Sequence, residues 1–113
     1  MTVTVKGLFS SKYAEAATTP QYTADSASKM RTTIDKFTGT NTTAGPLVLS
    51  VWLVPFGGTA DNSNLKKAKT LAAGECYGFP EVSGQTLNPG DFIATLASAV
   101  TSINIQASGR ENT

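Results

Sequence analysis

The residues of this chain that could do chemistry are its acidic side chains, its lysines and one thiol, because the sequence contains no histidine. Without imidazole, every catalytic device built on that ring is excluded, and a zinc site made of Cys and His ligands is excluded as well. Carboxylate pairs of the glycosidase type would need two acids held close together. Asp35, Glu75, Glu81 and Asp91 fall at expected strand ends or turns, where acids are normally solvated. The sequence therefore predicts no enzyme, no cofactor and no metal site.

Two further segments carry donor atoms but match no functional motif. Cys76, the single cysteine, has no partner for an intrachain disulfide, and the neighbouring Glu75 disfavours a reactive thiolate. We expect Cys76 to be a small core residue. Residues 61–64 offer oxygen ligands, but a calcium loop also needs a glycine at its sixth position and an acid at its twelfth. We expect a plain turn there.

The charge balance argues against nucleic acid and membrane partners. The net charge is +1, and the one basic cluster is Lys66, Lys67 and Lys69. These lysines could contact phosphate, yet no arginine or aromatic residue is interleaved with them. We therefore favour the other explanation, that these charges lie on an outer strand and block edge-to-edge pairing.

The sequence offers no recognisable export or membrane segment. Residues 1–6 alternate between polar and apolar types instead of forming a basic region followed by an apolar one. The longest apolar stretch, residues 47–56, falls well short of the roughly 20 residues that a spanning helix needs. We expect a protein made in the cytoplasm without a signal peptide.

The elements that must position these residues are strands. The 113 residues include 17 threonines, 10 serines and 10 glycines, a mixture that favours strands and turns over helices. Turns recur at intervals of roughly 8–15 residues between about eight apolar-rich segments. Breaks in the alternation at Gly7 and near Asp35 predict bulges. The expected fold is all-β, with residues 1–113 forming one jelly-roll-like β-sandwich.

The clearest strand, residues 47–54, has two largely apolar faces. Val48, Trp52 and Val54 share the face opposite Leu49 and Val51. Such a strand is central in its sheet, or its second face meets another chain. Phe56 follows in residues 55–64, a loop whose two glycines allow its ring to point outward. Packing in the core or over an open edge is the alternative role for these aromatic residues. We predict that Val48, Trp52, Val54 and Phe56 form a protein interface, since aromatic residues supply much of the binding energy at interfaces.

Residues 31–111 resemble small virion proteins of tailed bacteriophages. The similar phrases are turn and strand signatures: Ile34-Asp35-Lys36-Phe37, Asn41-Thr42-Thr43, Leu49-Ser50-Val51, Val54-Pro55, Gly57-Gly58-Thr59-Ala60, Leu71-Ala72-Ala73-Gly74-Glu75, Tyr77, Leu87-Asn88-Pro89-Gly90-Asp91, Ile93 and Ala107-Ser108-Gly109-Arg110-Glu111. The resemblance implies a β-sandwich component of the particle, of the decoration, cement, head-fibre or collar type. It implies no catalytic or binding residue.

From the residues and this resemblance we predict a non-enzymatic capsid decoration or cement protein, located in the virion. Its expected partners are the major capsid protein or another virion protein, together with further copies of itself, most simply as a trimer. A neck, collar or tail component is the nearest alternative. A carbohydrate- or receptor-binding module, with Trp52, Tyr77 or Tyr22 as a stacking platform, is the alternative of a different class.

Overall fold

The computed structural model describes residues 3–27 and 29–112, and within these ranges it contains strands and no helix. The strands are β1 (Val3–Tyr13), β2 (Thr19–Thr23), β3 (Arg31–Asn41), β4 (Leu47–Val54), β5 (Leu65–Leu71), β6 (Cys76–Tyr77), β7 (Thr86–Leu87), β8 (Phe92–Ala97) and β9 (Ile103–Asn112). The predicted all-β fold is confirmed.

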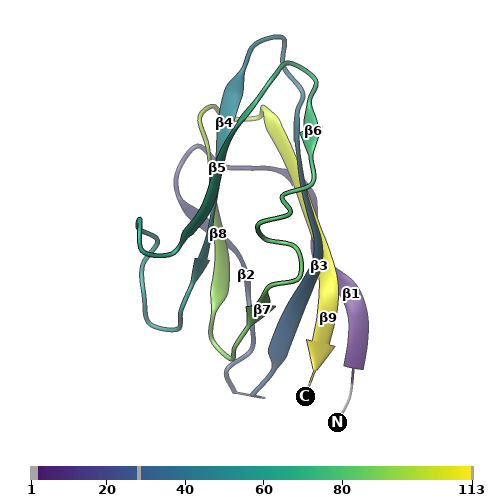
Figure 1. Ribbon diagram of the computed structural model, residues 1–113, viewed down its shortest axis with the longest axis vertical. Coiled ribbons are helices and arrows are strands. Elements are labelled where there is room, and N and C mark those ends of the chain that lie inside the picture. The colour runs from purple at the N-terminus through teal and green to yellow at the C-terminus, as the bar shows by residue number, and fades with distance from the viewer. Residues whose placement is uncertain (1–2, 28, 113) are drawn as a thin grey trace.

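The strands form two antiparallel sheets packed face to face (Figure 1). Sheet A has the order β1-β9-β3-β6, with β7 also paired to β3, and sheet B has the order β2-β8-β4-β5. The chain crosses between the sheets at nearly every connection, and only β4 and β5 are consecutive neighbours in one sheet. Both β6 and β7 pair with the same side of β3, so together they occupy the place of one interrupted strand. With that strand counted once, the fold has the eight strands and the connectivity of a jelly roll, as predicted.

Two predicted bulges lie where the alternation in the sequence breaks. The pairing of β1 with β9 shifts between Gly7 and Phe9, and that of β3 with β9 shifts between Ile34 and Lys36. The second bulge lets Ile34 and Phe37 both face the core, where both are fully buried. Strand β1 extends well past the first bulge, because its pairing with β9 resumes after a further shift and continues to Tyr13.

A chain of aromatic rings packs edge to face through the core. The ring centroid of Phe37 lies 5.8 Å from that of Phe9 and 5.2 Å from that of Phe79. Phe79 in turn lies 4.8 Å from Tyr77. Each such pair contributes about 0.5–1.5 kcal/mol beyond the burial of its area. Aliphatic residues of both sheets fill the rest of the core: Ile34, Leu49, Val51, Leu71, Leu87, Ile93, Ile103 and Ile105.

A buried amide fixes the crossing from sheet A to sheet B. Asn41, at the end of β3, is fully buried, and its side-chain nitrogen donates to the carbonyls of Gly45 (2.8 Å) and Leu71 (3.0 Å). Its oxygen accepts from the backbone of Thr43 at 2.9 Å. Because all these groups are satisfied, the turn before β4 is held against the end of β5 at little desolvation cost.

Near the other end of the sandwich, Tyr22 of β2 reaches across to sheet A. Its hydroxyl donates to the Glu111 carboxylate and lies 2.8 Å from Thr32 Oγ1. Glu111 also pairs with Lys6 at 3.5 Å. Burial, together with the hydrogen bond to Glu111, raises the pKa of Tyr22 to about 12. The two sheets are therefore joined here by a phenol that favours its neutral form.

This raised pKa predicts a loss of stability at alkaline pH. Above about pH 10 the unfolded chain releases the Tyr22 proton, whereas the folded chain keeps it until about pH 12. The stabilisation is thus complete below pH 10 and is lost as the pH rises through 12. We expect the free energy of unfolding to fall by about 1–2 kcal/mol over this range. This is less than the full pKa shift implies, because the Tyr22 ring is partly exposed. Urea unfolding of wild type and Tyr22→Phe between pH 8 and 12 measures it, and equal pH dependence of the two proteins would contradict the prediction.

Candidate interaction surface

The two outer faces of the sandwich differ in chemistry. The outer face of sheet A is polar and charged over β3 and β9, as the paired positions Lys36↔Ser108, Thr38↔Gln106 and Thr33↔Arg110 illustrate. The exposed Val3 and Val5 lie beside these residues, on the edge strand β1. Arg110 lies 3.0 Å from Asp35 across this face. An open hollow of about 270 Å³ lies here, lined by Lys36, Thr38, Gln106, Ala107 and Ser108. This face has the composition of a surface exposed to water.

The outer face of sheet B is nearly free of charge. Because residues directly opposite in a sheet share a face, the register places the partners of the outward β4 residues on it. We call this surface the sheet-B face, and its members are Val48, Ser50, Trp52, Val54, Leu65, Ala68, Thr70, Phe92, Ala94 and Leu96. One charged side chain, Lys66, lies at the margin of the sheet-B face among the described residues of β4, β5 and β8. It is the extra residue of a bulge in the edge strand β5.

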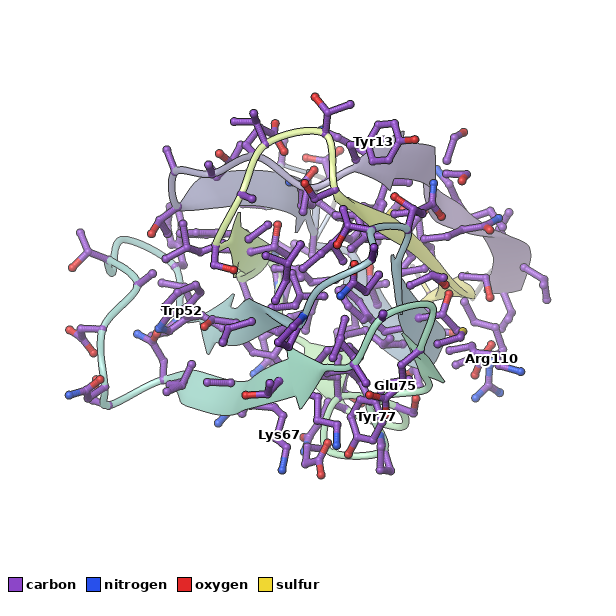
Figure 2. All side chains as sticks on the ribbon, turned by 90° about the horizontal axis from the view of Figure 1, so that it is seen from above. Tyr13, Trp52, Lys67, Glu75, Tyr77 and Arg110 are labelled. Atoms are coloured by element: carbon purple, nitrogen blue, oxygen red, sulfur yellow. The ribbon has the colours of Figure 1, made fainter. Side chains whose placement is uncertain are left out.

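Trp52 lies at the middle of the sheet-B face. It is opposite Ala94 of β8 on one side and Leu65 of β5 on the other, and it is half-buried, whereas Ala94 is almost fully buried. Figure 2 places Trp52 on the side of the molecule away from Arg110. Val48, nearer the start of β4, is 36% exposed. Both residues are positioned as the alternation of β4 predicted. Their contact with another protein stays a prediction.

Of the four predicted interface residues, Val54 is the one that is buried. It lies on the sheet-B face but is fully buried. The chain after β4 folds back over it: the Gly58 amide donates to the Pro55 carbonyl at 2.9 Å, and a Cβ built at Gly58 would lie 3.4 Å from Val54 Cγ1. Since its own loop covers it, Val54 cannot contact a partner. The assignment of Val54 to the interface is wrong, because alternation within a strand does not show what a distant loop covers.

Phe56 projects from the end of this face and is 71% exposed. Its backbone amide donates to Asp91 Oδ1 at 3.0 Å, which ties the loop to the turn before β8. In that turn Gly90 has φ +88°, and a Cβ there would lie 2.6 Å from the Phe56 ring. Gly57 also has a positive φ, +80°. The backbone conformations of these two glycines therefore leave the apolar Phe56 ring in water and fix the backbone around it.

Two of the three clustered lysines, Lys67 and Lys69, form ion pairs that we call the lysine clasp. Lys67 pairs with Glu81 at 3.8 Å and Lys69 with Glu75 at 3.9 Å, which links β5 to the segment around β6 in the other sheet. The Lys69 ammonium also lies 4.9 Å from the centre of the Tyr77 ring. Figure 2 shows Lys67, Glu75 and Tyr77 together on one side of the sandwich. Because both pairs are exposed to water and screened by it, they shield an open edge more than they stabilise the fold.

The aromatic residues considered as a glycan platform lie in three different places. Tyr22 points between the sheets to Glu111, and Tyr77 donates to Glu81 at 3.0 Å beneath the Lys69 ammonium. Trp52 lies on the outer face of sheet B. They therefore form no shared stacking surface, which weighs against the carbohydrate-binding alternative.

The acidic residues have structural partners in separate parts of the fold. Asp35 binds Arg110, Glu75 and Glu81 belong to the clasp, and Asp91 accepts from the Asn88 amide at 3.0 Å to close its turn. Across the described ranges, no three Cys, Asp or Glu side chains are grouped so that they could hold a metal ion. Residues 61–64 form a turn, in which Asp61 Oδ1 accepts from the Ser63 amide at 2.9 Å.

Cys76 is exposed, so its expected burial in the core is wrong. It occupies the two-residue strand β6, where successive side chains point to opposite faces. Tyr77 packs against the core, which leaves Cys76 facing solvent. Sequence reasoning also missed Leu65 and Leu96 as members of the sheet-B face. The signal for Leu65 was the break in alternation at Lys66, which sends Leu65 outward and Lys67 inward.

Comparisons with known proteins identify the fold and no family. No family model matches the chain, and no curated protein matches it in sequence. The structure is similar to a subunit of Bacillus endospore appendages, described as a novel family of disulfide-linked pili. That likeness has a TM-score of 0.62 and 14% identity, and covers 99% of this chain and 88% of the other. A protein of infectious bursal disease virus, strain Gt, also matches, with a TM-score of 0.36 and 13% identity over 97% of this chain and 32% of the viral one.

The likeness to the appendage protein spans nearly the whole chain and concerns the fold alone. Over the described residues, no helix is long and apolar enough to cross a membrane.

Proposed function

We propose that this chain is a non-enzymatic structural protein of a tailed-phage virion, and specifically a decoration or cement protein of the head shell. The observation that carries the proposal is the sheet-B face, an outer sheet surface with a half-buried Trp52 and one charge at its margin. A sheet surface made mostly of apolar side chains, with so little charge, supports a contact with another protein. A partner subunit that covered it would remove Val48, Trp52 and Phe56 from water.

The mechanism of such a protein is to clamp neighbouring subunits. A rigid sandwich that binds the assembled shell, but not free subunits, shifts the equilibrium toward the assembled state. The fold suits this role, since its core is continuous between the sheets and its open edge is closed by the lysine clasp. The protein of similar structure comes from endospore appendages described as pili, which supports a structural role in an assembly.

The test is to locate the chain on the particle. Cryo-electron microscopy of virions from the phage that encodes it should reveal a jelly-roll density at regular positions on the outside of the head. Density confined to the neck, collar or tail would support the alternative component of the particle. Absence of the chain from purified virions would overturn the proposal.

Phe56→Ala should weaken attachment to the particle without weakening the fold. Because the ring is 71% exposed, its truncation should leave the melting temperature nearly unchanged. If the ring anchors a partner, binding should fall by about 1–3 kcal/mol. Co-sedimentation with particles measures the first quantity and thermal unfolding the second.

Phe37→Ala is the matched truncation of a buried phenylalanine. It should lose about 3–5 kcal/mol of stability. A large loss of stability in Phe56→Ala with normal attachment would contradict the assignment of Phe56.

A further inference from the structure

We propose that the sheet-B face is covered by a second copy of the same face, so that two chains pack back to back through β4, β5 and β8. This inference rests on the proposed structural role and goes beyond it, since it names the partner that covers the apolar surface while the chain is free of the particle. The two copies would be related by a two-fold axis lying between the stacked sheets, an isologous contact.

Charge is the first argument for a second copy. A two-fold contact brings each group near its own equivalent, so a charged face meets like charge when it pairs with itself. The sheet-B face carries Lys66 only at the edge strand, where the side chain is exposed and can remain in water. The outer face of sheet A has Lys36, Arg110 and Asp35 over its middle strands. Self-association through sheet B therefore desolvates no central charge, whereas self-association through sheet A would desolvate several.

The area of the sheet-B face is the second argument. Three strands at about 4.8 Å spacing and six to eight residues at about 3.3 Å give a plane of roughly 300–400 Å². A stable specific interface buries about 800 Å² on each partner, so the sheet and the Phe56 loop together fit a reversible dimer better than an obligate one.

The described chain begins and ends on the sheet A side, in the paired residues Val3 and Asn112 (Figure 1). An affinity tag at either end therefore does not cover the proposed contact.

Ser50 offers the sharpest test, because it is half-exposed on the outward side of β4 between Val48 and Trp52. A single charge there, Ser50→Lys or Ser50→Glu, would be buried without a partner and should weaken self-association at least about tenfold. In an equimolar mixture of the two variants, opposite charges would meet across the two-fold axis, and association should be recovered at low salt. The matched controls are Thr38→Lys and Thr38→Glu on the outer face of sheet A, which should associate like wild type.

Sedimentation equilibrium of the purified full chain, from about 1 to 500 µM, measures these effects without any particle. The expected result is a concentration-dependent dimer in wild type, monomers in each Ser50 variant, and a mixed dimer when the variants are combined. A wild-type monomer at every concentration would overturn the proposal and leave the face to a different virion protein. A trimer or dimer unaffected by the Ser50 charges would overturn it too. Neither result bears on whether cryo-electron microscopy finds the chain on the head, so the two proposals fail separately.

Discussion

Gly109→Ala is expected to destabilise the protein by at least about 3 kcal/mol, the upper end of the cost of overpacking. A Cβ at Gly109 would lie 2.2 Å from the carbonyl oxygen of Thr33 and 3.3 Å from Ile34 Cα. The obstacle is backbone in the neighbouring strand, so no side-chain rotation relieves it. The register explains the closeness, because Gly109 pairs with Ile34 immediately before the bulge at Asp35. Since a domain of this size has roughly 5–15 kcal/mol of stability, this one methyl group removes a large part of it.

The matched control is Gly7→Ala in the adjacent strand β1. A Cβ at Gly7 would have no neighbour within 4 Å. That variant should differ from wild type by no more than about 0.5 kcal/mol. Urea unfolding followed by the fluorescence of Trp52 compares the two. Equal midpoints for Gly109→Ala and wild type would show that β9 can move away from β3 at this position.

Trp52→Glu is expected to weaken association at least about 100-fold, because it removes a large aromatic anchor and buries an unpaired charge. Trp52 lies at the middle of the sheet-B face, so the effect should appear whichever subunit covers it, a second copy or a shell protein. Co-sedimentation with particles and sedimentation equilibrium of the free chain measure the two contacts.

Thr38→Glu adds the same charge to the outer face of sheet A and should leave both contacts unchanged. Far-UV circular dichroism verifies that Trp52→Glu keeps its β-sheet content. If Trp52→Glu is folded and still associates like wild type, the sheet-B face is not an interface.

Much of the fold was determined by local features of the sequence. The alternation of residues 47–54 located β4, and the out-of-period spacing of Ile34 and Phe37 located a bulge that the register confirms. Turn residues at regular intervals predicted a sandwich. These inferences succeed because strand alternation and turn conformation depend on neighbours in the chain. The absence of histidine likewise excluded imidazole chemistry without any structure.

Tertiary structure alone decided which outward residues remain exposed. Val54 and Trp52 share one face of β4, yet the loop after β4 covers Val54 and leaves Trp52 half-exposed. Cys76 faces solvent because Tyr77 takes the core side of a two-residue strand. Lys67 and Lys69 pair with Glu81 and Glu75, which flank β6 of the opposite sheet. Each outcome depends on segments that lie far apart in the sequence and meet only in the folded chain. There, packing between the sheets determines which side chains are buried or paired, and the alternation of a single strand does not.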